Sequence, residues 1–192
     1  MNNLTCVDAQ ADMRKAYLCG APGVLVSGGV WLLAAAVALF ASGRLAVWTL
    51  LIGGMFIFPL SLVLTRLLGH SGRHAPDNAL GRLAGEGTFA LVACIAVAFG
   101  LSLVRVEWFF AAMLLFIGGR YLTFQTLYGL RLYWLLGAVL CAAGLGVGLG
   151  RPPAAVGACA GAVIELLFAW QLFAAARKAV PANADTVRGL SK

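Results

Sequence analysis

Residues 133–150 have the sequence YWLLGAVLCAAGLGVGLG and residues 154–176 have the sequence AAVGACAGAVIELLFAWQLFAAA, separated only by Arg151, Pro152 and Pro153. Each run suits a helix that crosses a bilayer, because such a helix needs about 20 mostly apolar residues. Neither run alternates in polarity over about 10 residues, as a membrane strand would. The two runs therefore predict transmembrane helices joined by a sharp turn.

Long apolar segments recur through the rest of the chain. Of the 192 residues, 62% are hydrophobic and 11% are charged, and the mean hydropathy is +0.94. Soluble domains carry about 25% charged residues, and disordered chains combine high charge with low hydrophobicity, so both classes are excluded. The sequence predicts an all-α integral membrane protein, a bundle of six transmembrane helices.

The expected helices leave a polar segment at each end of the chain. They cover residues 22–41, 45–68, 79–104, 108–128, 133–150 and 154–176. Residues 1–21 are expected to form an N-terminal leader and residues 177–192 a tail. Asp77 or Asn78 is well placed to cap the helix from residue 79, because short polar side chains accept hydrogen bonds from free N–H groups.

Basic residues predict the orientation of the bundle. With the N-terminus in the cytoplasm, ten of the 14 Lys and Arg residues lie on the cytoplasmic side, and Arg44, Arg105 and Arg151 lie on the other. Cytoplasmic loops of membrane proteins are enriched in Lys and Arg. We therefore predict that both termini are cytoplasmic. The formal net charge of +7 is explained by these helix-end residues, so no nucleic-acid partner is expected.

Two charged residues lie deep inside apolar segments. Arg120 is 12 residues beyond Trp108 and Glu165 is 13 residues beyond Pro152, both counted from the outer ends of their helices. At about 1.5 Å per residue, both lie roughly 18–20 Å below the outer edge of a hydrocarbon core about 30 Å thick. Each charge alone costs about 2.5–3.5 kcal/mol at the bilayer centre. We expect either an ion pair that joins the two helices or a site that binds a solute, an ion or a proton.

Small residues follow one face of each of the last two helices. Around Glu165 this face contains Ala154, Ala158, Gly161, Ala162 and Ala169. On residues 133–150 it contains Gly137, Cys141, Gly144 and Gly148. Because small faces let helices approach closely, we expect these two helices to pack against each other. Glu165 would then face protein, and Leu166 would point to the side or to lipid.

Further polar side chains extend the candidate substrate-binding site. Besides Arg120 and Glu165, it contains Tyr121, Gln125, Tyr128, Gln171 and Glu86. Glu86 follows Arg82 by four residues, a spacing that allows an ion pair on a helix. We expect that pair to be a solvent-exposed bridge at the helix end rather than part of the pocket.

The sequence predicts no cofactor, no bound metal and no catalytic residue. His70 and His74 have a spacing that can bind zinc on a helix, but they lie in a Gly- and Pro-containing loop without a third firm ligand. The five cysteines are expected to pack as small apolar residues.

Short motifs in the middle of the chain resemble a known group of proteins. They are Ile57–Leu60, Arg66–Gly69, Asp77–Gly81, Arg120–Leu122 and Leu127–Tyr128. They resemble an uncharacterised family of small bacterial multi-pass membrane proteins, a domain of unknown function. The resemblance implies a bacterial inner-membrane location and supplies no activity. In that family the position of Arg120 is often histidine, so this sequence departs from the pattern there.

These observations lead to one functional hypothesis and two alternatives. We expect a solute or ion transport component in contact with the lipid bilayer, with Arg120 and Glu165 as its polar centre. The first alternative is a non-catalytic scaffold that assembles with partners, or as a homo-oligomer, through its small-residue faces. The second is an enzyme that modifies lipids.

Overall fold

The computed structural model describes residues 5–179, which form helices joined by short loops. The elements are α1 (Cys6–Tyr17), the 3-10 helix η1 (Leu18–Gly20), α2 (Ala21–Phe40), α3 (Gly43–Leu67), α4 (Ala79–Val104), α5 (Val106–Tyr128), α6 (Leu132–Gly150) and α7 (Ala154–Ala179). Six helical stretches are long and apolar enough to cross a membrane, the first of them formed by α1, η1 and α2 together. No strand occurs within residues 5–179, so the predicted all-α membrane fold with six spans is confirmed.

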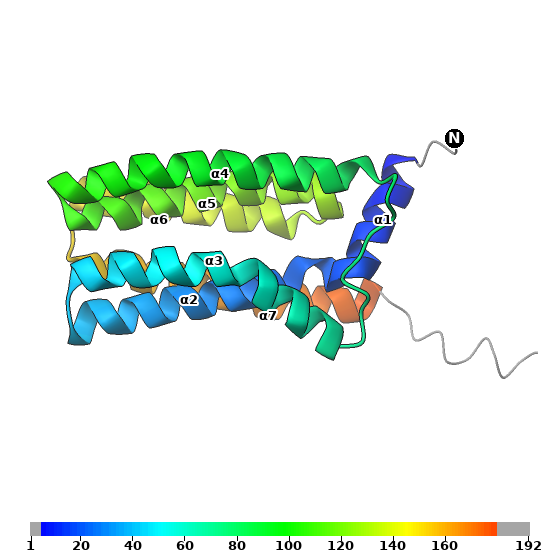
Figure 1. Cartoon of the computed structure of the whole chain (residues 1–192), viewed down its shortest axis with the longest axis horizontal. Coiled ribbons are helices and arrows are strands. Elements are labelled where there is room, and N and C mark those ends of the chain that lie inside the picture. Colours follow the sequence, from blue (N-terminus) through cyan, green and yellow to red (C-terminus); the bar gives the residue numbers. More distant parts are fainter. Residues whose placement is uncertain (1–4, 180–192) are drawn as a thin grey trace, which may run out of the picture.

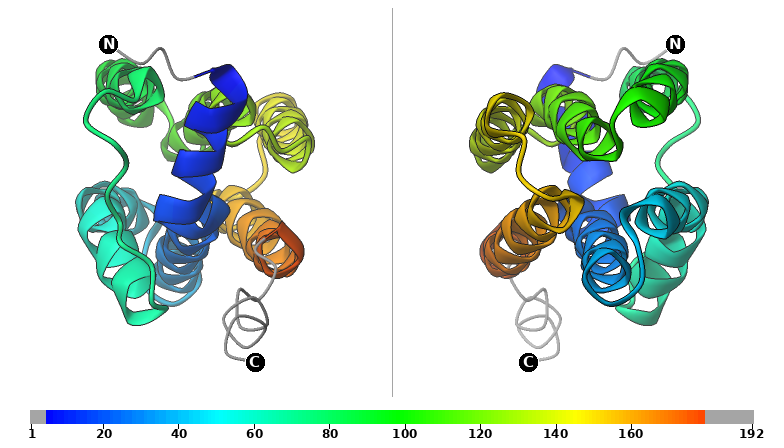
Figure 2. Two further views of the ribbon diagram at one scale, coloured as in Figure 1. Left: turned by 90° about the vertical axis from the view of Figure 1, so that its right-hand side faces the viewer. Right: turned by 90° about the vertical axis from the view of Figure 1, so that its left-hand side faces the viewer.

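The six long helices form two rows of three (Figure 1). In one row α2 packs between α3 and α7, and in the other α5 packs between α4 and α6. Seen along the helix axes, the rows lie one above the other (Figure 2). Contacts between the rows come mainly from α7, which touches both α5 and α6. The central helices α2 and α5 therefore carry much of the buried core.

Local capping explains where the helices begin and end. The Ser42 hydroxyl accepts a hydrogen bond from the Leu45 N–H at the start of α3, and the Asn78 side chain accepts one from the Leu80 N–H at the start of α4. The sequence predicts a cap at Asp77 or Asn78, and the structure has it at Asn78. Gly129 ends α5 with a φ of 67°, a left-handed conformation that glycine adopts without strain.

The N-terminal leader contains a helix that crosses one end of the bundle (Figure 1). The Asn78 amide donates to the Ala9 carbonyl and to the Asp12 carboxylate, at 3.0 and 2.8 Å. On the other side, the Arg14 guanidinium donates to the Tyr128 carbonyl at 2.7 Å. Helix α1 is thus bound both to the loop before α4 and to the end of α5.

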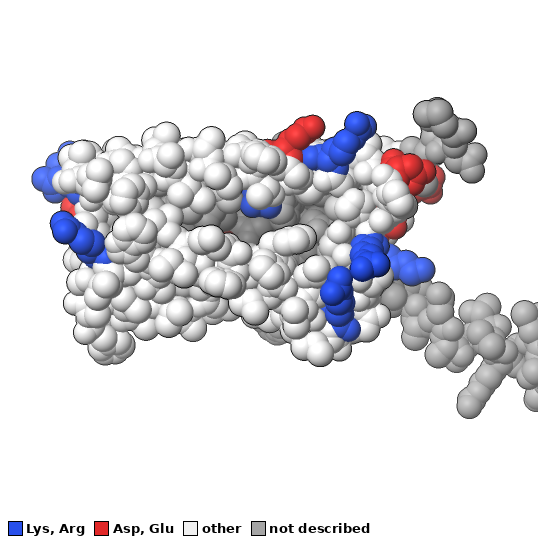
Figure 3. Space-filling view, viewed as in Figure 1, with Lys and Arg blue, Asp and Glu red and all other residues white. Residues whose placement is uncertain are grey.

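On the face shown in Figure 3, charged side chains lie mostly toward the two ends, and most of the surface between them is uncharged. Large apolar side chains are exposed along this surface, for example Met55 on α3 and Phe89 on α4, which are 75% and 81% exposed. Such a surface suits hydrocarbon, in which helices satisfy their own backbone hydrogen bonds.

The small-residue faces contact different helices from those predicted. An added Cβ on Gly137 of α6 would lie 2.7 Å from the Gly118 carbonyl oxygen of α5, and one on Gly161 of α7 would lie 2.5 Å from the Trp31 ring of α2. The expectation that α6 and α7 pack tightly together is met only in part, because the two helices touch but each small-residue face packs on another helix. The faces are contact faces, but α6 follows α5 through a short turn and packs on it, while α7 packs on α2.

Candidate functional site

Glu165 lies inside the bundle, where α7 meets α2 and α5. The residue is 0% exposed, and neither carboxyl oxygen has a hydrogen-bond partner among the described residues. The hydroxyls of Ser27 on α2 and Tyr121 on α5 lie beside the carboxyl, but neither meets the geometry of a hydrogen bond to it. Buried polar groups are nearly always hydrogen-bonded, so an unpartnered buried carboxyl calls for an explanation.

The packing of α2 on α7 holds Glu165 in this position. An added Cβ on Gly28 would lie 3.0 Å from the Leu166 side chain, so the two helices are in close contact next to Glu165. One turn away along α7, Gly161 accommodates the Trp31 ring. Leu166 is partly exposed, as expected for a residue at the side of this face, and it packs against Gly28 of α2. The expectation that Glu165 faces protein is confirmed.

Arg120 lies next to Tyr121 on α5 but extends toward a different helix. Its Nη2 donates a hydrogen bond of 2.9 Å to the Thr88 hydroxyl of α4. Its guanidinium carbon lies 5.4 Å from the centre of the Phe124 ring. Its Nε is buried and has no hydrogen-bond partner among the described residues.

Arg120 and Glu165 do not form the ion pair that the sequence allows. Within residues 5–179, the one salt bridge joins Arg105 and Glu107. Successive residues on a helix are about 100° apart, so only one of Arg120 and Tyr121 can face α7. Tyr121 takes that direction, and Arg120 is left to face α4. The ion-pair alternative is thus corrected, and two separate polar groups remain.

Aromatic residues fill the space between Tyr121 and the end of the bundle that α1 covers. Tyr133 of α6 stacks on both Tyr121 and Tyr128, with ring centres 6.0 and 5.4 Å apart. The Tyr133 hydroxyl donates to the Cys19 carbonyl at 2.7 Å. Cys19 belongs to η1, the break between α1 and α2, and its backbone is non-helical there, with a φ of 56°. The cluster thus connects α5 and α6 to the helix break.

The remaining candidate residues lie apart from Glu165. Gln125 lines a separate pocket with Arg131 and Trp134. Gln171 is exposed on α7.

The Arg82–Glu86 bridge is absent from the described part of the chain. Both side chains are exposed near the start of α4. Water can solvate each exposed charge, so an ion pair between them gains little. The expectation that they form an ion pair is therefore wrong.

The two histidines bind parts of the protein rather than each other. The His74 Nδ1 lies 2.8 Å from the Tyr17 hydroxyl, and the His70 Nδ1 lies 2.9 Å from the Lys15 carbonyl oxygen. Both contacts attach the loop before α4 to α1. Within the described residues, no group of three or more His, Cys, Asp or Glu residues could hold a metal ion.

Sequence reasoning did not identify Ser27 and Thr88 as neighbours of the two charges. Both lie in long apolar helices, where serine and threonine often bond to their own backbone, as Thr88 does to the Ala84 carbonyl. Ser27 and Thr88 are polar residues in otherwise apolar segments, which marks them as unusual. The sequence does not show which helix either side chain faces.

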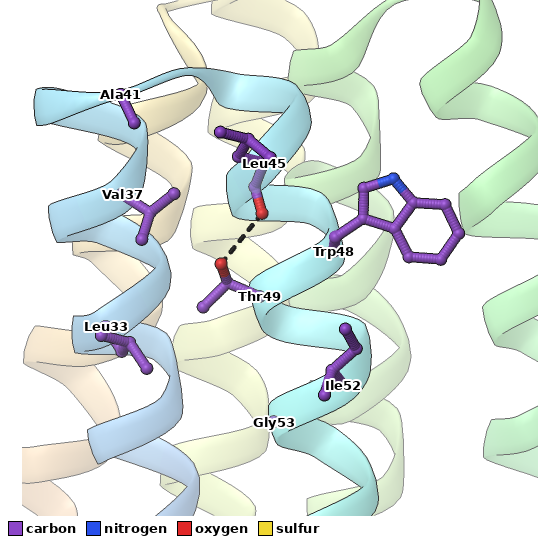
Figure 4. A pocket seen from close by; sticks show the side chains of 8 residues that line it. All are labelled: Leu33, Val37, Ala41, Leu45, Trp48, Thr49, Ile52 and Gly53. Atoms are coloured by element: carbon purple, nitrogen blue, oxygen red, sulfur yellow. Dashed lines mark hydrogen bonds between the residues drawn. The ribbon is translucent and has the colours of Figure 1, made fainter.

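An apolar pocket lies between α2 and α3, away from both charges (Figure 4). Its lining residues are Leu33, Val37, Ala41, Leu45, Trp48, Thr49, Ile52 and Gly53. The polar member, Thr49, donates its hydroxyl to the Leu45 carbonyl at 2.9 Å. The pocket therefore offers apolar contacts, and its one hydroxyl is already bonded to the backbone.

A family model matches most of the chain. Residues 6–175, from the start of α1 to near the end of α7, match the model of a family of unknown function. Comparisons with curated proteins and with solved structures found no match. This match is consistent with the resemblance of the sequence motifs to an uncharacterised family. Because the match covers most of the chain, the protein belongs to the family of unknown function DUF7010.

Proposed function

We propose that the protein is a transport component of the bacterial inner membrane, and that Arg120 contacts a small anionic solute. The observation that carries this proposal is the state of the Arg120 guanidinium. It lies in the middle of a transmembrane helix, has no carboxylate partner within the described residues, and keeps a buried Nε without a hydrogen bond.

The chemistry of the guanidinium supports an anion as the ligand. A guanidinium has five N–H donors and always carries its charge. One of these donors is bonded to Thr88, a neutral hydroxyl that does not compensate the charge. A cation at membrane depth is costly unless it is paired or hydrated. An anionic solute would supply the missing charge and the missing hydrogen-bond acceptors.

The surroundings of Arg120 support access from outside the bundle. Arg120 is partly exposed, and its partner Thr88 is exposed on α4. The space-filling view shows a hollow between the two rows, with basic side-chain atoms midway along it (Figure 3). The scaffold alternative has less support, because the small-residue faces on which it depends pack against helices of the same chain.

A transport assay tests the proposal. In proteoliposomes on a solid-supported membrane, we expect at least one member of a panel of small organic and inorganic anions to evoke a current. Arg120→Gln should weaken that response at least roughly tenfold, because hydrogen bonds to charged groups contribute about 1.5–3 kcal/mol. The matched control is Arg82→Gln, an exposed arginine of α4, which should leave the current unchanged. A current evoked only by cations, or one unchanged in Arg120→Gln, would contradict an anion site at Arg120.

We further propose that both termini lie in the cytoplasm. The support is the excess of basic residues on one side, together with the position of α1 and the end of α7 at the same end of the bundle (Figure 1). A cytoplasmic reporter fused after Lys192 or in the loop at Arg73 should be active. A periplasmic reporter should be active at Arg44, Arg105 or Arg151. Periplasmic activity of a reporter at Lys192 would reverse the orientation.

A further inference from the structure

A charged Glu165 carboxylate without a partner would be energetically unfavourable at this position. It is 0% exposed, both of its oxygens are unpartnered, and the nearest basic residue on α5, Arg120, is bonded to α4 instead. An isolated ionised carboxylate in an apolar surrounding is strongly disfavoured and neutralises instead. The group must therefore bind a cation for most of the time.

The size of the site favours a proton over a metal ion or an organic cation. Close packing of Gly28 on Leu166 and of Gly161 on Trp31 leaves little space between α2 and α7 beside Glu165. Hard metal cations such as Ca²⁺ and Mg²⁺ take about six or more oxygen ligands. Around Glu165 the neighbouring side chains supply only its own carboxyl and the hydroxyls of Ser27 and Tyr121.

The neighbouring hydroxyls suit both protonation states of a carboxyl. A hydroxyl donates one hydrogen bond and also accepts hydrogen bonds. After a small movement of the side chains, the Ser27 and Tyr121 hydroxyls can accept a hydrogen bond from the protonated carboxyl or donate one to the carboxylate. An amide or an amine at these positions would not serve both states equally.

The groups on each helix around Glu165 leave Tyr121 as its closest titratable neighbour. Helix α2 contributes the non-titratable Ser27, and α5 contributes Tyr121 while Arg120 faces α4. Beyond Tyr121, the stacked Tyr133 of α6 bonds to the Cys19 carbonyl of η1. Buried polar groups thus continue from Glu165 toward the end of the bundle that α1 covers.

We propose that Glu165 is a proton-exchange site, which takes up and releases one proton beside the hydroxyls of Ser27 and Tyr121. The proton adds to a carboxylate oxygen of Glu165 and leaves from the same oxygen, so no other bond is made or broken. The site concerns a different residue from the proposed anion contact at Arg120. It stands whether or not Arg120 binds a solute, and protonation of this carboxyl would let the bundle respond to a proton gradient.

Labelling with dicyclohexylcarbodiimide tests this proposal on the intact protein. This reagent enters apolar sites and reacts with protonated carboxyls, and peptide mass mapping locates the product. We expect the label on Glu165 in the unmodified protein, with a yield that falls as the pH rises. Tyr121→Phe and Ser27→Ala each remove a donor to the carboxylate, so the pH at which labelling falls should rise by about one unit.

The controls keep this result interpretable. Asp77→Asn removes an exposed carboxyl of the loop before α4 and should leave the labelling of Glu165 unchanged. Because the primary measurement uses the unmodified chain, it does not depend on the folding of any Glu165 variant. Labelling that spares Glu165 at every pH would overturn the proposal. Protection of Glu165 by Na⁺ at constant pH would also overturn it, because the bound cation would then be a metal ion.

Discussion

Gly137→Ala is expected to lower the free energy of unfolding by about 1–3 kcal/mol, the usual cost of overpacking a close contact. The added Cβ would lie 2.7 Å from the Gly118 carbonyl oxygen, which belongs to the backbone of α5. A backbone atom within a helix cannot move aside as a flexible side chain can. The α5–α6 pair would have to separate, and small residues at such interfaces are what permits close helix approach.

The matched control for Gly137→Ala is Gly146→Ala on the same helix. An added Cβ on Gly146 meets nothing within 4 Å. Alanine is a better helix former than glycine by about 1 kcal/mol, so this variant should be neutral or slightly more stable. Both variants would be compared by thermal and denaturant unfolding in the same detergent. Equal effects at the two positions would contradict the close α5–α6 contact.

Trp31→Ala is expected to cost about 3–5 kcal/mol, the range for truncating a large buried aromatic residue. Trp31 is 1% exposed, and its ring packs against Gly161 of α7 and lies 6.3 Å, centre to centre, from the Phe110 ring of α5. The side chain therefore joins the two rows of helices. Its removal would leave a cavity between α2, α5 and α7.

Trp170→Ala provides the control for Trp31→Ala, because Trp170 is 74% exposed on α7. We expect it to change the unfolding midpoint in detergent far less than Trp31→Ala. Trp31→Phe adds a second comparison, since it keeps most of the apolar contact and removes an indole N–H that has no hydrogen-bond partner among the described residues. A larger loss of stability for Trp170→Ala than for Trp31→Ala would contradict the burial of Trp31 between the two rows.

The helices could be predicted from the sequence because hydrocarbon imposes one strong condition. Each span must be a long apolar helix, and polar residues must interrupt the chain where it leaves the bilayer. The expected helix at residues 79–104 has the same bounds as α4, and that at 133–150 differs from α6 by one residue. Turn chemistry at Asn78 and at the Arg151–Pro153 stop accounts for this agreement.

The partners of the helix faces could not be predicted in the same way. The faces around Gly137 and Gly161 were identified as contact faces, but several arrangements of six helices bury both. In water, apolar area would help to choose among them, whereas in lipid the outer surface is as apolar as the core. The choice depends on local shape, such as the fit of Trp31 against Gly161, which a residue pattern does not contain.

The positions of Arg120 and Glu165 along their helices could be counted from the sequence, whereas the directions of their side chains could not. Counting residues places Arg120 and Glu165 at similar levels, and two opposite charges at one level suggest a pair. The pair does not form, because the orientation of α5 turns Tyr121 toward Glu165 and Arg120 toward Thr88. Ser27 and Thr88 were missed for the same reason.

A double-mutant cycle on Arg120 and Glu165 is the most direct test of the central claim that these two side chains do not pair with each other. The free energies of unfolding of Arg120→Gln, Glu165→Gln and the double variant would be measured in one detergent. Independent sites predict that the two single effects add to within about 0.3–0.5 kcal/mol. A buried ion pair predicts single losses of about 3–5 kcal/mol, of which the double variant recovers a part because no unpaired charge remains. Additive effects would agree with the separate sites described above, and such a recovery would contradict them.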